Sequence, residues 1–392
     1  MSEIKVNSIK GVAASTAAIT VNNTDGTCTA NLRTRSNKNL IINGEALVHQ
    51  RGDASVAVSD GNYLVDRFVF QNNGTLTGTG AQDSTVPDIA NSSYFAKSMK
   101  VTSTGTTAAS SAGDYAAIGT RLERNDVANL GWGTSNAQTV TLSFYVRSSK
   151  TGIFSAYLIG GDGYNRTFTF EYTIASANTW QKVEKTISGD TGGTWTYSSA
   201  NTIGLGVVFV LENLGSGAGT TSTLNSWVGA NNYAGSTNQV NLFDTNGATF
   251  YITGIQLEIG SVATDFEHRS FGQELALCQR YFQKSFDATV TPAVGSSKCV
   301  YTFTRPYAAG YHEGLGNDYI VEMRSQPSVV FYPTAATGSG SVGQVTYYDG
   351  SWSHVTPVYN TSNSTNKRLV FTMNTNSSTT LVQYNYTLSA EL

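Results

Sequence analysis

The chain has 392 residues, a formal net charge of −3, and charged side chains at only 13% of its positions. Because globular domains average roughly a quarter charged residues, small polar residues and 39 glycines fill the difference here. This balance excludes an electrostatic attraction to nucleic acid or to an anionic membrane, and the 11% of aromatic residues argues against disorder.

The cysteines and the start of the chain indicate the compartment in which the protein is made. Cys28, Cys278 and Cys299 are too scattered for a disulfide framework or a close-spaced zinc site, which favours a reducing cytoplasm. The first five residues lack the basic and apolar regions of a signal peptide. No stretch approaches the roughly 20 apolar residues that span a bilayer. We therefore expect neither secretion by that route nor membrane insertion.

Residues 1–38 differ in composition from the rest of the chain. Ile4, Val6 and Ile9 predict a short strand, and the polar sequence after it is too poor in large apolar residues to form a core. A frayed terminus and an arm that orders when it docks on a partner both remain open. We favour the arm, because an apolar strand heads an otherwise polar segment.

From residue 39 onward, strand-like runs alternate with turn signals. The clearest run is 139–147, where apolar residues at every second position indicate a half-buried strand. Further strands are expected at 40–42, 63–70, 154–158, 167–174, 180–187, 203–211 and 248–257. Such a series without a regular repeat predicts a jelly-roll β-sandwich over residues 39–270 and argues against a β-helix.

Residues 271–284 break this pattern. Apolar residues at 271, 275, 278 and 282 have helical spacing, with Ser270 as N-cap and Glu274 in the first turn. We expect a short linking helix over 271–284, which must pack on a neighbour to be stable. Residues 285–392 then predict a second, smaller β-sandwich, with strands at 298–304, 319–323, 328–331, 344–348, 368–373 and 380–388.

Searches for catalytic patterns fail. The chain has no G-x-S-x-G, no H-E-x-x-H and no phosphate-binding loop, so we expect no enzyme activity and no catalytic residues. We expect no cofactor. A structural Ca²⁺ ion stays open because side-chain oxygens are plentiful, although no Ca²⁺-loop pattern supports it. Glycoside hydrolysis needs only two carboxylates, and nothing in the sequence pairs any of the candidates Glu123, Asp162, Glu171 and Glu212.

Sugar binding has better support from the residues. Aromatic rings stack on the apolar faces of sugars, and low-charge loops rich in Asn and Asp supply hydrogen bonds; the loop 162–166 combines both. Strand aromatics are more simply explained as core, whereas loop aromatics fit either role. The predicted contact residues are Trp195, Tyr197, Trp227 and Tyr233 in the first sandwich and Tyr307, Tyr311, Tyr347, Tyr348 and Trp352 after residue 285.

Several short segments follow one another over roughly residues 39–284. They are Asn39-Leu40-Ile41-Ile42-Asn43-Gly44, Gln50-Arg51-Gly52, Asp66-Arg67-Phe68, the closing runs 250–261 and 263–270, and Glu274-Leu275-Ala276-Leu277-Cys278-Gln279-Arg280-Tyr281-Phe282. In this order they resemble a module common in bacteriophage tail-fibre proteins. Ala46 and His49 depart from the usual pattern of that module, and Phe68 stands where a Trp is common.

The resemblance implies a virion protein with a jelly roll similar to carbohydrate-binding modules. Residues 1–38, with Ile4, Val6 and Ile9, would attach to tail, nozzle or baseplate proteins, and residues 285–392 would form a host-facing tip. Both chain ends, 2–7 and 386–392, are similar to those of such fibres. The family further implies a homotrimer assembled in the host cytoplasm.

Three functions from different classes follow from these observations. The first is adhesion to a polysaccharide or receptor on the host surface, by weak sites multiplied over several copies. The second is a purely structural virion component, such as a head decoration or tail spacer. The third is a polysaccharide depolymerase. We favour adhesion.

Overall fold

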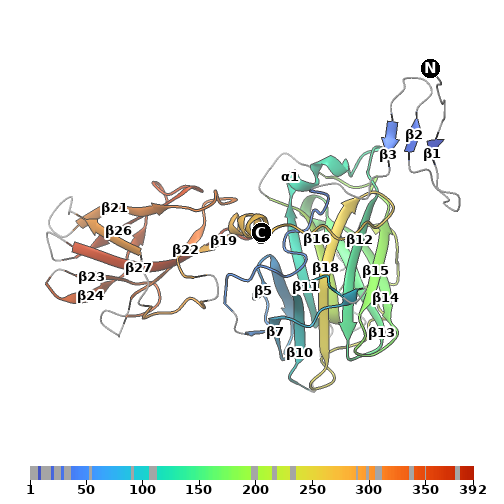
Figure 1. The fold of residues 1–392 in the computed structure, drawn as a ribbon, viewed down its shortest axis with the longest axis horizontal. Helices are drawn as coiled ribbons and strands as arrows, with labels where there is room; N and C mark the ends of the chain where they lie inside the picture. Colours follow the sequence, from blue (N-terminus) through green and yellow to red (C-terminus); the bar gives the residue numbers. More distant parts are fainter. Residues whose placement is uncertain are drawn as a thin grey trace.

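The structure, a computed structural model, consists of two β-sandwiches and a small N-terminal sheet (Figure 1). Within the residues it describes it is nearly all β, which confirms the predicted fold class. The described residues are 8–9, 19–21, 28–30, 37–52, 55–89, 92–105, 113–195, 202–213, 219–229, 235–287, 290–296, 300–304, 311–334, 340–348, 350–375 and 380–392.

The first sandwich, which we call the body, is built from two antiparallel sheets. One has six strands, in the order β15 (Gln181–Ile187), β12 (Val140–Ser148), β18 (Thr249–Ile259), β10 (Ser98–Ser103), β7 (Gly78–Asp83) and β4 (Val56–Ala57). The other has seven, in the order β17 (Trp227–Val228), β14 (Arg166–Ile174), β13 (Gly152–Gly160), β16 (Ile203–Asn213), β11 (Tyr115–Glu123), β6 (Phe68–Asn73) and β5 (Tyr63–Val65).

Alternating apolar side chains from the two sheets form one core between them. The rings of Phe144 on β12 and Phe209 on β16 meet edge to face with their centroids 4.9 Å apart, and both are fully buried. Each fully buried ring stabilises the fold by about 2–3 kcal/mol. The sequence period of two, seen in 139–147, places these residues because successive side chains of a strand point to opposite faces.

Smaller elements join the strands of the body. They are the hairpin β8 (Asp88–Ile89) and β9 (Ser92–Ser93), helix α1 (Arg124–Val127), and the 3-10 turns η1 (Ala128–Leu130) and η2 (Asp162–Tyr164).

The C-terminal sandwich has its own core, around Phe331, Phe371 and Tyr384. Strand β27 (Thr380–Ser389) is its centre and pairs with β19 (Phe282–Lys284), β20 (Val300–Thr304), β22 (Ser328–Tyr332) and β23 (Val345–Tyr348), which in turn pairs with β24 (Trp352–Val355). A second sheet runs β21 (Tyr311–Asp318), β26 (Arg368–Asn374) and β25 (Val358–Tyr359).

The N-terminal sheet is made of β1 (Ser8–Ile9), β2 (Ile19–Val21) and β3 (Cys28–Ala30). It lies on the side of the body away from the C-terminal sandwich (Figure 1). Ile9, one of the predicted attachment residues, pairs with Ile19; Ile4 and Val6 lie outside the described residues. Neither this part nor any other described segment contains a helix long and apolar enough to cross a membrane.

Two strands predicted in the body differ in the structure. The run 63–70 is a hairpin, because Asp66 and Arg67 form a tight turn in which Arg67 has a φ of 72°. The run 40–42 is a bend, because the amide of Asn39 bonds to the backbone of β18 and Asn43 adopts a positive φ. In the C-terminal sandwich the predicted strand 319–323 is a loop that follows β21.

The linking helix is also shorter than the predicted 271–284. Helix α2 spans Phe271–Gln279, with Ser270 and Gln273 in a capping box, and Phe282–Lys284 form strand β19 instead. The predicted apolar stripe is wrong at Phe271, which is 51% exposed, while Glu274 is buried and accepts a hydrogen bond from the backbone N–H of Asn43. Polar contacts with the body therefore hold the helix more than apolar burial does.

The two sandwiches are joined by a group of charges that we call the junction clasp: Arg51, Asp66, Arg67 and Glu391. Glu391, close to the end of β27, pairs with Arg51 at 2.9 Å and with Arg67 through its other oxygen. The guanidinium of Arg51 lies between the rings of Tyr63 and Phe282, 4.0 Å from each centroid. Because the side chain of Arg67 is only 3% exposed, this carboxylate neutralises a charge that water cannot reach.

Further contacts surround the clasp. Glu123 at the end of β11 accepts two hydrogen bonds from Arg280, at 2.7 and 2.9 Å, and one from the hydroxyl of Tyr281. Burial alone would raise the pKa of the Glu123 carboxyl, but these bonds and the charge of Arg280 outweigh it and hold the pKa below its usual range. Arg324 donates to the carbonyls of Ala390 and Glu391. Three of the segments that carry the tail-fibre resemblance, 50–52, 66–68 and 274–282, thus contribute to this junction.

We expect Glu391→Ala to destabilise the protein by about 3–5 kcal/mol, because it leaves the buried Arg67 without a carboxylate and Arg51 with only Asp66, at 3.4 Å. The measurement is the free energy of unfolding in urea. The matched control is Glu322→Ala, which removes an exposed pair with Lys367 and should cost less than about 1 kcal/mol. Equal, small losses in both variants would show that the clasp does not hold the sandwiches.

Candidate functional site

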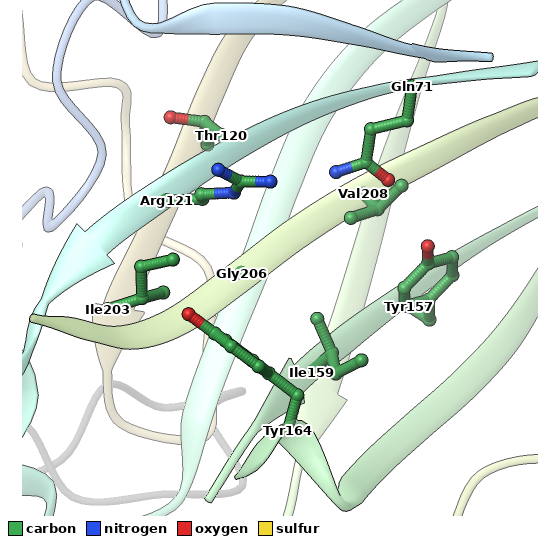
Figure 2. A pocket seen from close by; sticks show the side chains of 9 residues that line it. All are labelled: Gln71, Thr120, Arg121, Tyr157, Ile159, Tyr164, Ile203, Gly206 and Val208. Atoms are coloured by element: carbon green, nitrogen blue, oxygen red, sulfur yellow. The ribbon is translucent and has the colours of Figure 1, made fainter. Parts of the chain in front are cut away.

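The outer face of the seven-stranded sheet of the body contains a hollow of about 130 Å³. Its middle lies over β16, where Gly206 has no side chain to fill the space; Arg121 and Gln71 lie on one side and Tyr157, Ile159 and Tyr164 on the other (Figure 2). The lining residues are Gln71, Thr120, Arg121, Tyr157, Ile159, Tyr164, Ile203, Gly206 and Val208.

The floor and the rim of the hollow differ in burial. Tyr157, Ile159 and Val208 are buried and pack together as a small apolar cluster on this face. Gln71, Arg121 and Tyr164 are only half-buried, so the hollow opens to the surface between them. An apolar floor with a few polar groups at the rim is the usual composition of a ligand site.

Local backbone geometry produces this shape. A Cβ atom at Gly206 would lie 2.9 Å from Cγ2 of Ile159, so a larger residue at 206 would both clash and fill the hollow. The turn η2 reverses the chain between β13 and β14 with positive φ at Gly163 and Tyr164. This turn returns the Tyr164 ring over the apolar cluster.

The remainder of the same sheet face is covered. Gln239, in the long connection between β16 and β18, accepts hydrogen bonds from the backbone N–H and the hydroxyl of Ser155 on β13. Glu171 on β14 accepts from Ser236 and Asn238 of the same connection. This covering limits the hollow to the part of the face formed by β13, β16, β11 and β6.

Three of the four carboxylates considered for hydrolysis are engaged elsewhere, and the fourth, Asp162, lies in the turn η2. Glu123 belongs to the contacts around the junction clasp, Glu171 fixes the covering connection, and Glu212 accepts a hydrogen bond from the backbone N–H of Phe243. The residues that line the hollow include no Asp or Glu. Among the described residues, no group of three or more His, Cys, Asp or Glu side chains is placed to hold a metal ion.

The predicted contact residues Trp195 and Trp227 lie outside the hollow, in a cluster with Trp132. The three indoles meet edge to face, with centroids 5.0–5.8 Å apart, and Trp132 is fully buried. The indole N–H of Trp195 donates to Asp190 and that of Trp227 to the carbonyl of Ser188. Both half-buried rings therefore pack against the core of the body, and a sugar-contact role for them stays a prediction.

The predicted residues of the C-terminal sandwich are partly brought together. Tyr348 and Trp352 face each other across the β23–β24 hairpin, with ring centroids 5.0 Å apart, and Tyr348 is 42% exposed. Tyr347 instead packs against the core. Tyr311 begins β21, and Tyr197, Tyr233 and Tyr307 lie outside the described residues.

Sequence reasoning did not identify the hollow as a site. Tyr164 lies in the loop 162–166, whose composition does indicate sugar binding, so this signal was present. Tyr157, Arg121 and Gln71 are strand residues that alternate away from the core, and they resemble ordinary surface positions. Only the pairing of β11 with β16, which sets Arg121 opposite Gly206, brings them around one space.

No protein-family model matches the chain, and no curated protein sequence matches it. Among solved structures, the enzymatically active domain of tailspike protein 4 from bacteriophage CBA120 matches 57% of this chain and 21% of that chain, at 12% identity and a TM-score of 0.31. A family 11 carbohydrate-binding module of Clostridium thermocellum matches 55% of this chain and 98% of its own, at 12% identity and a TM-score of 0.27.

An N-terminal cellulose-binding domain from Cellulomonas fimi β-1,4-glucanase C is also similar, over 42% of this chain and 79% of its own, at 10% identity and a TM-score of 0.24. Carbohydrate-binding modules and a phage tailspike domain are thus among the structures that this chain is similar to. TM-scores this low carry no argument about function, which is argued below from the site.

We expect Trp227→Ala to lower the free energy of unfolding by about 3 kcal/mol, because the indole fills space beside Phe168 and Trp132. Tyr348→Ala, which truncates an exposed ring, should cost less than about 0.5 kcal/mol. Chemical unfolding of both variants measures the difference. A Trp227 variant as stable as the parent would contradict a packing role and favour ligand contact.

Proposed function

We propose that the chain is an adhesion protein of a bacteriophage tail fibre that binds host-surface glycans through the hollow on the seven-stranded sheet. The observation that carries the proposal is the arrangement of Tyr157 and Tyr164 opposite Gln71 and Arg121, around a space that no side chain fills (Figure 2).

This arrangement has the chemistry that a sugar requires. A tyrosine ring packs on the C–H face of a sugar, while an amide and a guanidinium hydrogen-bond its hydroxyl groups. A volume of about 130 Å³ equals that of about four water molecules, so the hollow admits one sugar unit or part of one. A single contact of this size binds weakly, and several copies of the chain on one particle would multiply it into firm attachment.

The tail-fibre part of the proposal rests on the sequence resemblance. In this proposal residues 1–38 attach to the tail, nozzle or baseplate, and the chain is a homotrimer in the virion, assembled in the host cytoplasm. The protein binds the glycan without cleaving it, since the carboxylates near this sheet serve structural contacts. The body then presents the glycan site.

The test is binding of the purified chain to surface polysaccharides from a panel of bacterial strains, measured by calorimetry. For a polysaccharide that binds, Tyr164→Ala should weaken the affinity about tenfold, equivalent to about 1.4 kcal/mol, because the ring forms one wall of the hollow. Phe271→Ala, which removes an exposed ring on α2, is the control and should bind as the parent does.

Three outcomes would contradict the proposal. A folded chain that binds no polysaccharide in the panel would favour a purely structural virion role. Release of reducing ends from a bound polysaccharide would indicate a depolymerase. Binding that Tyr164→Ala leaves unchanged would locate the site elsewhere in the chain.

A further inference from the structure

Arg121 is the one charged residue among those that line the hollow. Resting on the proposed glycan-binding function, we infer that the hollow selects acidic sugars and that Arg121 binds the carboxylate of a uronic-acid-type unit.

The register of the sheet directs Arg121 toward the hollow. Arg121 on β11 pairs with Gly206 on β16, so both residues face the same side of the sheet. Because Gly206 has no side chain, the Arg121 side chain borders an open space over β16 (Figure 2). A substituent of a bound sugar can therefore reach the guanidinium across the floor of the hollow.

The guanidinium of Arg121 differs from those of other arginines of the body in its hydrogen-bond partners. Arg166 is bound by both oxygens of Asp190 at 2.7 Å, and Arg280 by both oxygens of Glu123. Arg121 has no Asp or Glu side chain as partner in the described part of the chain; its Nη1 donates to the main-chain oxygen of Leu392, the last residue of the sequence. A guanidinium has five N–H donors, so donors remain for a ligand.

The surroundings of Arg121 add to this positive charge. Arg67 donates to the backbone carbonyl of Arg121, and Arg67 and Arg51 share the single carboxylate of Glu391. Asp66, the other acid of the clasp, is buried, and this desolvation outweighs the nearby Arg51 and raises the pKa of its carboxyl. Arg51, Arg67 and Arg121 thus outnumber the acidic side chains Asp66 and Glu391, and Arg51 pairs with both of these acids.

The chemistry of the pocket suits a carboxylate in particular. A guanidinium and a carboxylate are planar and form two parallel hydrogen bonds, which are stronger than bonds between neutral groups. The apolar floor of Tyr157, Ile159 and Val208 lowers the local dielectric constant and strengthens such a pair. The amide of Gln71 and the ring of Tyr164 are left for the hydroxyls and the apolar face of the same sugar.

The closing experiment compares one polysaccharide in two chemical forms. A uronic-acid-containing polysaccharide that binds the parent chain is carboxyl-reduced, which converts each uronic acid to the corresponding neutral hexose and leaves the linkages intact. We expect the native form to bind at least tenfold more tightly than the reduced form, and this ratio to fall as the salt concentration rises. This comparison uses the unmodified chain, so it does not depend on how a variant folds.

Variants then locate the effect. Arg121→Gln should reduce binding of the native form to about the level of the reduced form, while Arg368→Gln, an exposed arginine of the C-terminal sandwich, should keep the parent's preference. Thermal unfolding of Arg121→Gln shows whether the loss of its bond to Leu392 alters the fold.

The outcomes separate this inference from the proposed function. Equal binding of the native and reduced forms would overturn the acidic-sugar inference and leave glycan binding intact. Preference for a sulfated polysaccharide over the carboxylated one would overturn the assignment of a carboxylate. Binding of neither form, nor of any other polysaccharide in the panel, would overturn the proposed function itself.

Discussion

One carboxylate, Glu391, neutralises Arg51 and Arg67 between the two sandwiches, and the arrangement of the whole chain depends on it. Burial of a guanidinium costs several kcal/mol unless a well-placed anion offsets it. Arg67 is held in a turn of the body, whereas Glu391 follows β27, the last strand of the C-terminal sandwich. This pair therefore fixes how the two sandwiches sit against each other. The C-terminus of the chain lies at their junction (Figure 1).

Strand β11 connects this junction with the hollow. Its last residue, Glu123, binds Arg280 and Tyr281 at the start of the C-terminal sandwich. Two residues earlier, Arg121 lines the hollow and donates to the main-chain oxygen of Leu392. Arg51, Arg67 and Arg280 at the junction lie in the segments that carry the sequence resemblance, whereas the proposed binding residues Tyr157, Tyr164 and Gln71 lie outside those segments.

The sequence predicted the fold well where burial follows a simple period. The run 139–147 became β12 and the run 203–211 became β16, because alternating or continuous apolar residues leave few other ways to form a core. It failed at 63–70, where the buried contacts of Asp66 and Arg67 impose a turn within an apolar run. The strand Gly78–Asp83 was missed because its small and polar residues have no β preference, and its partners β10 and β4 supply the pairing.

The hollow was not predictable, since it depends on the absence of a side chain at Gly206 beside a residue 85 positions away, Arg121.

The location of glycan binding is the central claim, and hydrogen exchange read by mass spectrometry tests it most directly. The backbone amides of the intact chain would be compared with and without a saturating acidic oligosaccharide. The account predicts slower exchange in β13, β16 and β11 and in the turn Asp162–Tyr164, with the β23–β24 hairpin little changed. Protection confined to the hairpin of Tyr348 and Trp352, or to the cluster of Trp195 and Trp227, would contradict it.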